Sequence, residues 1–207
     1  MLWAALLAGI AGYVDAICYL RLGGAFAANM TGNLVEVGMG IAARQWSWAA
    51  WCASLIIAFL LGILAARLLL RTHRSPRLSL LIEAGVIAAA ASGKLGLAAV
   101  PVLAAAMAMQ NEAVTHGVVA VNVAFITGDI QRLGERIVPG TMPGQQPRKH
   151  EGQRWLILAI LVFYAAGAAI GTVASGWDAP ALILPAAVLA GGALLPKRWT
   201  GSAAQRQ

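Results

Sequence analysis

MTGNL at residues 30–34 and ITGDI at residues 126–130 are two copies of one motif. A shift of 96 residues aligns the copies and also aligns the glycine and the isoleucine that follow each of them. Four of the eleven positions from Thr31 to Ile41 are then identical, where roughly one identity is expected in so biased a composition. The motif therefore marks an internal repeat.

The register of this repeat extends beyond the motif. The shift of 96 residues also places Asp15 on Asn111. With nine extra residues in the intervening loop, a shift of 105 places a small-xxx-small series centred on Gly62 on a second series centred on Gly167. Small residues at this spacing let helices approach closely. Each half is then predicted to contain one membrane span, one segment with the Thr-Gly (TG) motif and two further spans. The two halves are predicted at residues 2–93 and 95–195.

The composition is that of an integral membrane protein. Of the 207 residues, 60% are hydrophobic and 11% are charged, whereas soluble chains average about 25% charged residues. Six spans of about 20 residues use roughly 120 residues, so only short loops remain. We therefore expect one membrane domain over residues 1–207, with a polar cytoplasmic loop at 139–154.

Six apolar runs are long enough to cross a bilayer. They occupy residues 2–20, 48–70, 78–92, 95–115, 155–175 and 179–195. The stretches 25–43 and 118–137 are less apolar and carry the TG motif near their middle. Each of these two either crosses as a broken helix or enters and leaves on one side.

Basic residues favour the second arrangement for both TG stretches. With six crossings and both termini cytoplasmic, twelve of the fifteen Lys and Arg residues face the cytoplasm. With eight crossings only ten do, and the dense basic group at 67–77 lies outside, against the positive-inside rule. Three crossings per repeat is an odd number, so the second repeat is inverted. Transporters and channels use inverted repeats with interrupted helices to build a site near the midplane.

Three runs carry a family resemblance. GYVDAICYLRLGGAFAANMTGNLVEVG, AMAMQNEAVTHG and VAFITGDIQRLGE resemble the YoaK-like family of bacterial membrane proteins, the DUF1275 family, and the resemblance extends from about Ala4 to Leu195. The family has no known function, so the resemblance implies a bacterial polytopic membrane protein and no substrate. Many members have an aliphatic residue shortly after TGN, where this chain has Glu36.

The TG segments are the first candidate site. Asn33 and Asp129 follow a glycine that interrupts the helix, and each is expected to open a short helix. Their side chains could simply cap free backbone N–H groups. Alternatively, the two helix N-termini meet a solute at the midplane, with the hydroxyls of Thr31 and Thr127 and the amide of Asn33 as contacts. The carboxylate of Asp129 offsets the partial positive charge at the N-terminus of one of the two helices. This favours a path for a cation, a proton or a neutral solute over a symmetric anion pore.

Other polar residues inside the spans have two interpretations each. Asp15 and Asn111 lie on a face of small residues, where an unpaired charge is expensive, so Asp15 either marks a pathway or bonds to a TG loop. Glu36 and Arg132 occupy equivalent positions with opposite charge, so either a pseudo-twofold axis brings them together as an ion pair, or each lies near its own interface and snorkels to water. Two further intramembrane acids could relay protons, although the second lies close enough to the cytoplasmic end to be interfacial. These acids are Glu83 and Glu112.

No enzyme activity, cofactor or metal is expected. Asp15 and Asp129 resemble the paired aspartates of intramembrane proteases only faintly, because a GxGD sequence is absent and each aspartate aligns with an asparagine in the other repeat. The chain has no Walker motif, Rossmann fingerprint or metal-ligand spacing. Its basic residues cluster at the ends of apolar runs, which suits orientation in a bilayer better than binding of nucleic acid.

The sequence thus predicts an all-α polytopic membrane protein with six transmembrane helices and two re-entrant or broken TG segments, arranged as two inverted repeats. Its expected role is a secondary transporter or channel for a small solute or ion in the bacterial cytoplasmic (inner) membrane. A scaffold or lipid-interacting protein without transport is the alternative, and an intramembrane aspartyl hydrolase is a remote one. Expected partners are the lipid bilayer, a small solute or ion and, in a homo-oligomer, further copies of the chain.

Overall fold

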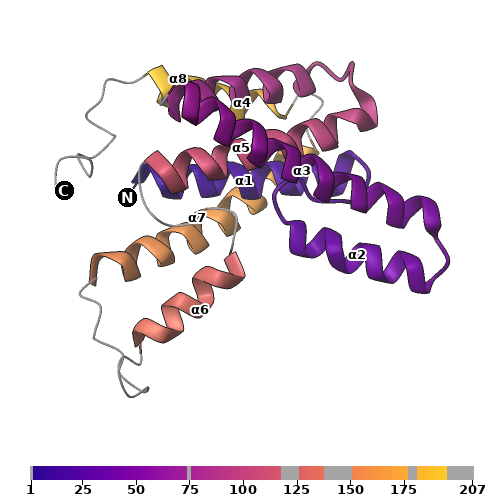
Figure 1. Cartoon of the computed structure of the whole chain (residues 1–207), viewed down its shortest axis with the longest axis horizontal. Helices are drawn as coiled ribbons and strands as arrows, with labels where there is room; N and C mark the ends of the chain where they lie inside the picture. The colour runs from indigo at the N-terminus through magenta and orange to yellow at the C-terminus, as the bar shows by residue number, and fades with distance from the viewer. Residues whose placement is uncertain (1, 74–75, 118–125, 138–150, 177–180, 195–207) are drawn as a thin grey trace.

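The computed structural model describes residues 2–73, 76–117, 126–137, 151–176 and 181–194, and within these ranges the chain is helical without strands (Figure 1). The helices are α1 (Leu2–Arg21), α2 (Met30–Ala42), α3 (Trp46–His73), α4 (Pro76–Ala91), α5 (Ala99–Gly117), α6 (Ile126–Ile137), α7 (Glu151–Ser175) and α8 (Ile183–Leu194). A short 3₁₀ turn, Gly96–Ala98, precedes α5. The all-α prediction is confirmed. The predicted loop at 139–154 lies outside the described residues up to residue 150, and its remainder is the first turn of α7.

Among the described residues, four helices are long and apolar enough to cross a membrane, and they are α1, α3, α5 and α7. Each coincides with one of the predicted apolar runs. Helices α4 and α8 have 16 and 12 residues. At 1.5 Å per residue they are about 24 and 18 Å long, less than the roughly 30 Å of a bilayer core. Span-length helices therefore match four of the six expected crossings.

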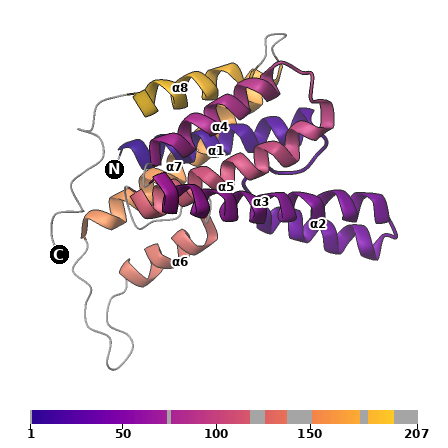
Figure 2. The same ribbon diagram turned by 45° about the horizontal axis from the view of Figure 1, so that its top comes forward.

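The central helices are α1 and α5, in which 67% of each span window is buried. The outer helices are α3 and α7, with 17% and 28% of their windows buried. Helix α1 packs against α7, α5 packs against α3, and α4 lies against both α5 and α8. Helix α2 runs along α3 and α6 along α7, and these two pairs project on opposite sides of the centre (Figures 1 and 2).

Small residues allow the closest helix contacts. A Cβ atom built on Gly167 of α7 would lie 1.9 Å from the carbonyl oxygen of Gly9 in α1. A Cβ atom on Gly62 of α3 would lie 2.3 Å from the carbonyl oxygen of Ala105 in α5. At both places backbone meets backbone, as the small-xxx-small pattern predicts. Helix α1 therefore approaches α7, and α3 approaches α5, because glycine has no side chain at the contact. Large side chains do not interlock there.

Large apolar side chains cover the outer faces of α3 and α7. Leu61 of α3 is 58% exposed and Val173 of α7 is 64% exposed, and similar residues extend along both helices. In a soluble protein such surfaces mark binding sites, whereas on span-length helices they suit contact with lipid tails. Several polar side chains, such as those of Asp15, Asn33 and Asp129, are instead buried inside the protein.

Candidate functional site

The first turns of α2 and α6 meet at a cavity of about 220 Å³. Aromatic residues of α3 and α7 complete its wall. The lining residues are Ala28, Asn29, Met30, Thr31, Phe59, Ile126, Thr127 and Tyr164. One water needs only about 10–15 Å³ of such space, while drug-sized ligands occupy roughly 300–1,000 Å³. The cavity therefore suits several waters or one small solute.

Each TG motif lies in the first turn of a helix. Helix α2 begins at Met30, and Asn29 caps it by accepting a hydrogen bond of 3.1 Å from the N–H of Gly32. Helix α6 begins at Ile126, the equivalent position. The expectation that the glycine interrupts a helix is therefore corrected, because the helix starts two residues before it. Gly32 is required for another reason, since a Cβ atom there would lie 2.9 Å from the ring of Phe26.

Asn33 is a positioning residue for the loop before α2. Its side chain is fully buried, and its Nδ2 donates to the carbonyl of Phe26 at 2.8 Å while its Oδ1 accepts from the N–H of Phe26 at 2.9 Å. The Phe26 ring also stacks on Tyr19, with 4.9 Å between ring centroids. The amide of Asn33 is thus used by the protein backbone. Asn33 does not line the cavity, although its neighbour Thr31 does.

Asp15 lies directly behind the cavity wall. Its carboxylate is buried and accepts two hydrogen bonds of 2.6 Å, one from the N–H of Ala28 and one from the hydroxyl of Tyr164. Both donors belong to lining residues. The bond to Ala28 is the contact with a TG loop that one interpretation of the sequence predicted. Because Tyr164 connects the carboxylate to the cavity, this position also remains compatible with a role in a pathway.

The predicted ion pair between Glu36 and Arg132 is not formed, and each residue has a partner in its own half. The guanidinium of Arg132 lies 3.3 Å from the carboxylate of Asp129, three residues earlier on α6. The indole N–H of Trp48 donates to Glu36 at 3.0 Å. Asp129 is fully buried, and its pairing with a nearby cation offsets the cost of burying the carboxylate. Local helix geometry therefore prevails over the pairing expected from symmetry.

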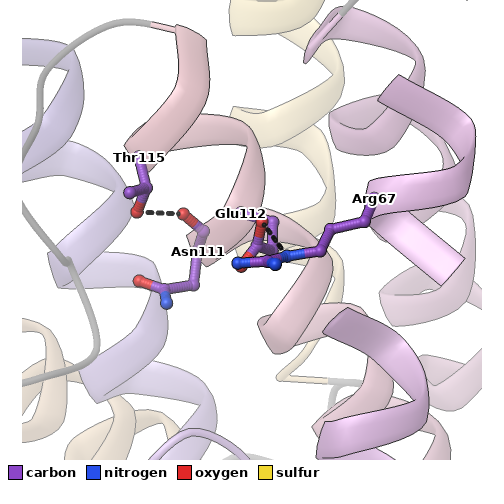
Figure 3. Close-up of polar contacts among 4 residues, drawn as sticks. All are labelled: Arg67, Asn111, Glu112 and Thr115. Carbon is purple, nitrogen blue, oxygen red and sulfur yellow. Dashed lines mark hydrogen bonds and ion pairs between the residues drawn. The ribbon is translucent and has the colours of Figure 1, made fainter. Parts of the chain in front are cut away.

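Asn111 and Glu112 of α5 are buried, and neither lines the cavity. Figure 3 shows the directions of their side chains. The side chain of Glu112 points to α3, where Nε of Arg67 lies 3.3 Å from its carboxylate. The amide of Asn111 points to another side of α5, and its backbone carbonyl accepts from the hydroxyl of Thr115 at 2.8 Å. Glu112 is only 7% exposed, so its carboxylate is largely covered by the protein.

Of the predicted site residues, only Thr31 and Thr127 line the cavity themselves. Sequence reasoning missed its aromatic walls, Phe59 of α3 and Tyr164 of α7. A signal for them existed, because the shift of 105 residues that aligns the small-residue series also aligns Phe59 with Tyr164. In the part of the chain that is described, no cluster of three or more residues that could hold a metal ion occurs.

The chain matches a known protein family and a known relative. A family described as "Protein of unknown function (DUF1275)" matches residues 3–195. The "UPF0700 transmembrane protein YoaK" of Bacillus subtilis (strain 168) is 27% identical over 177 residues, which is 79% of each chain. No solved structure matches. The long apolar helices and these matches agree that the protein is a helical membrane protein.

Proposed function

The chain belongs to the DUF1275 family, for which no function is described, and from this premise we propose that it is a secondary transporter or channel for a small solute or ion. The observation that carries the proposal is that two motifs 96 residues apart, through Thr31 and Thr127, line a single cavity. Helix N-termini that face a shared site inside a helical membrane protein are one way in which transporters bind a solute.

The proposal includes two inverted repeats. The shift of 96 residues relates Gly9 to Ala105, and the shift of 105 relates Gly62 to Gly167. The two close contacts, Gly9 with Gly167 and Ala105 with Gly62, are therefore equivalent pairs. The similar burial of α1 and α5, and of α3 and α7, supports the same relation. These equivalences favour a pseudo-twofold axis that passes through the cavity.

The lining chemistry favours a small polar solute or a cation. The hydroxyls of Thr31, Thr127 and Tyr164 can each donate and accept a hydrogen bond. Two helix N-termini add partial positive charge, and the carboxylates of Asp15 and Asp129 lie near these ends and offset it. Phe59 supplies an apolar wall. A site of this kind selects by hydrogen bonding and size rather than by strong attraction of anions.

The proposed topology has six crossings with both termini in the cytoplasm of a bacterial cell, and the protein in its inner membrane. Helices α4 and α8 supply the two crossings beyond the four span-length helices. Local thinning of the bilayer can compensate for the short described lengths of these two helices. The support for orientation is the distribution of Lys and Arg, twelve of fifteen on the cytoplasmic side.

A scaffold without transport is the second candidate, and a specific observation favours it. The side chains of Asp15 and Asn33 both bond to the loop before α2, so part of the buried polar network serves the fold. We do not propose an enzyme. In an aspartyl hydrolase two carboxylates share a proton, whereas Asp15 bonds to Tyr164 and Asp129 to Arg132.

The decisive experiment measures flux into liposomes that contain the purified protein. A panel of small neutral solutes and monovalent ions is screened first against empty liposomes. The permeant found is then tested with Thr127→Cys in a background without native cysteines, before and after reaction with a small hydrophilic thiol reagent. We expect the reaction to reduce flux by a factor of about ten or more, because each 1.4 kcal/mol of added barrier in a filled cavity is tenfold in rate.

The matched control is Val188→Cys on α8, an exposed position outside the cavity lining. The same reagent should leave its flux unchanged. If folded wild-type protein passes nothing above empty liposomes across the whole panel, or if modification at Thr127 leaves flux intact, the transport function is wrong. The scaffold function then becomes the better description.

A further inference from the structure

A second group of buried polar residues lies apart from the cavity. Glu83 of α4 is fully buried, and neither of its carboxylate oxygens has a hydrogen-bond partner among the described residues. The same holds for the hydroxyl of Ser79 one turn earlier, and for Oε1 of Gln110 in α5. None of the three lines the cavity. Buried polar atoms are nearly always hydrogen-bonded, so these require an explanation.

Ser79 and Glu83 lie one turn apart on α4, and α4 packs against α5, which carries Gln110. Helices α4 and α5 pack together as a hairpin, with Glu83 eight residues before the end of α4 and Met107 eight residues after the start of α5. Side chains in a helix lean toward its N-terminus, so Glu83 leans toward Ser79 and toward the level of Gln110. The Nε2 of Gln110 donates to the carbonyl of Leu7 at 3.0 Å, which fixes the amide and leaves its oxygen for another donor.

The helices around this group surround it with apolar side chains. Helix α4 contacts α5 and α8, and α1 contacts the same two helices, so the four helices form a ring. Leu80 and Ile87 of α4, Leu103 and Met107 of α5 and Leu189 of α8 are buried in it. An ionised carboxylate in such surroundings is expensive unless a cation is beside it.

Described charged groups on the neighbouring helices are directed elsewhere. Helix α8 has no ionisable residue. On α5, Glu112 pairs with Arg67 of α3, and on α1, Asp15 bonds to Ala28 and Tyr164. On α4 itself Arg77 lies at the start of the helix, in a partly exposed position. Within the described ranges no donor reaches the carboxylate of Glu83, so its charge has to be removed by another route.

We propose that Glu83, Ser79 and Gln110 form an intramembrane proton-binding site. The carboxylate of Glu83 takes up one proton, and the resulting O–H donates to Oε1 of Gln110, an acceptor that has no partner among the described residues. The hydroxyl of Ser79, one turn away on the same helix, adds a second polar group to the site. Release returns the same proton and leaves the carboxylate. The site exists independently of the proposed passage of a solute. If a solute does pass, this site supplies a place where its movement can be coupled to protons.

Infrared spectroscopy of the full-length protein in lipid tests the site without any solute. At neutral pH the wild type should show the C=O band of a protonated carboxylic acid in an apolar environment. Glu83→Gln, which keeps the size and removes the acid, should lose this band completely. Exchange into D₂O should shift the band, because a working site exchanges its proton with water.

Two neutral variants serve as controls, Asp15→Asn and Glu112→Gln, and both should keep the band. The proposal is wrong if wild-type protein lacks the band, if Glu83→Gln retains it, or if it stays unshifted in D₂O after prolonged exchange. The band should also be insensitive to sodium, so its loss on adding sodium chloride at constant pH would overturn the proposal in favour of a metal-cation site. If Glu83→Gln fails to fold, Gln110→Leu gives the assignment, because removal of the acceptor should shift the band of Glu83 and not that of another buried acid.

Discussion

Replacing Gly167 with alanine should separate two central helices that now touch. The added Cβ atom would lie 1.9 Å from the carbonyl oxygen of Gly9, and real Cβ atoms keep at least 3.0 Å. Helices α1 and α7 must therefore move apart by about 1.1 Å at this point, the difference between 3.0 and 1.9 Å. The obstacle is backbone, so no side-chain rotation can relieve it. Overpacking of a core costs about 1–3 kcal/mol, and we expect Gly167→Ala near the upper end of this range.

The same substitution elsewhere provides a matched control with the opposite sign. Gly85 of α4 has nothing within 4 Å of the position that a Cβ atom would take, so alanine there meets open space. Glycine inside a helix is less stable than alanine by roughly 0.5–1 kcal/mol, so Gly85→Ala should stabilise the protein slightly. Gly62→Ala should be destabilising, but less than Gly167→Ala, because its Cβ would lie 2.3 Å from the oxygen of Ala105.

The measurement is unfolding of the purified variants by SDS in mixed micelles, followed by circular dichroism. The predicted order of stability is Gly85→Ala above wild type, then Gly62→Ala, then Gly167→Ala. If Gly167→Ala is as stable as Gly85→Ala, the two helices do not meet through backbone. The equivalence of the two small-residue contacts would then lose its basis.

Three further predictions concern topology and the buried acids. Cysteines placed singly at Gly144, Trp177 and Gln205 in a cysteine-free background should react with an impermeant thiol reagent from outside only at Trp177, and outside labelling at Gly144 would overturn the six-crossing topology. Asp15→Asn should reduce flux of the identified permeant, and it should cost about 1.5–3 kcal/mol in SDS unfolding because one hydrogen bond to a charged group is lost. Unchanged flux would make Asp15 purely structural. Glu112→Gln should leave flux intact. It should change the free energy of unfolding by only about 0–1 kcal/mol, since the guanidinium of Arg67, with which Glu112 pairs, is largely exposed. A large loss of flux would contradict the placement of Glu112 away from the cavity.

The helical content and the meeting of the TG segments were within reach of the sequence. Apolar runs of about 20 residues have one stable form in lipid, because backbone groups must bond within the segment. The shift of 96 residues assigned Thr31 and Thr127 to equivalent places, and both line the cavity. Small residues at helical spacing indicated close contacts, and Gly62 and Gly167 make them.

The details of the buried network were out of reach of sequence patterns. The pattern treated Gly32 as a helix breaker, whereas the ring of Phe26 and the cap Asn29 determine its place in the first turn of α2. Arg132 pairs with an aspartate one turn away, because neighbours three residues apart on a helix meet at no cost in loop ordering. Such preferences depend on local three-dimensional geometry, which a repeat alignment does not contain.

The most direct test of a solute pathway is the rate at which cysteines in the cavity react in a bilayer. Thr31→Cys and Thr127→Cys are made separately after replacement of the buried Cys18 and Cys52, and each is treated with a small hydrophilic thiol reagent. Both should react much faster than Val173→Cys on the outer face of α7, because water reaches the cavity and not the lipid-facing surface. Rates for both cavity cysteines as low as that for Val173→Cys would contradict a water-accessible path between α2 and α6.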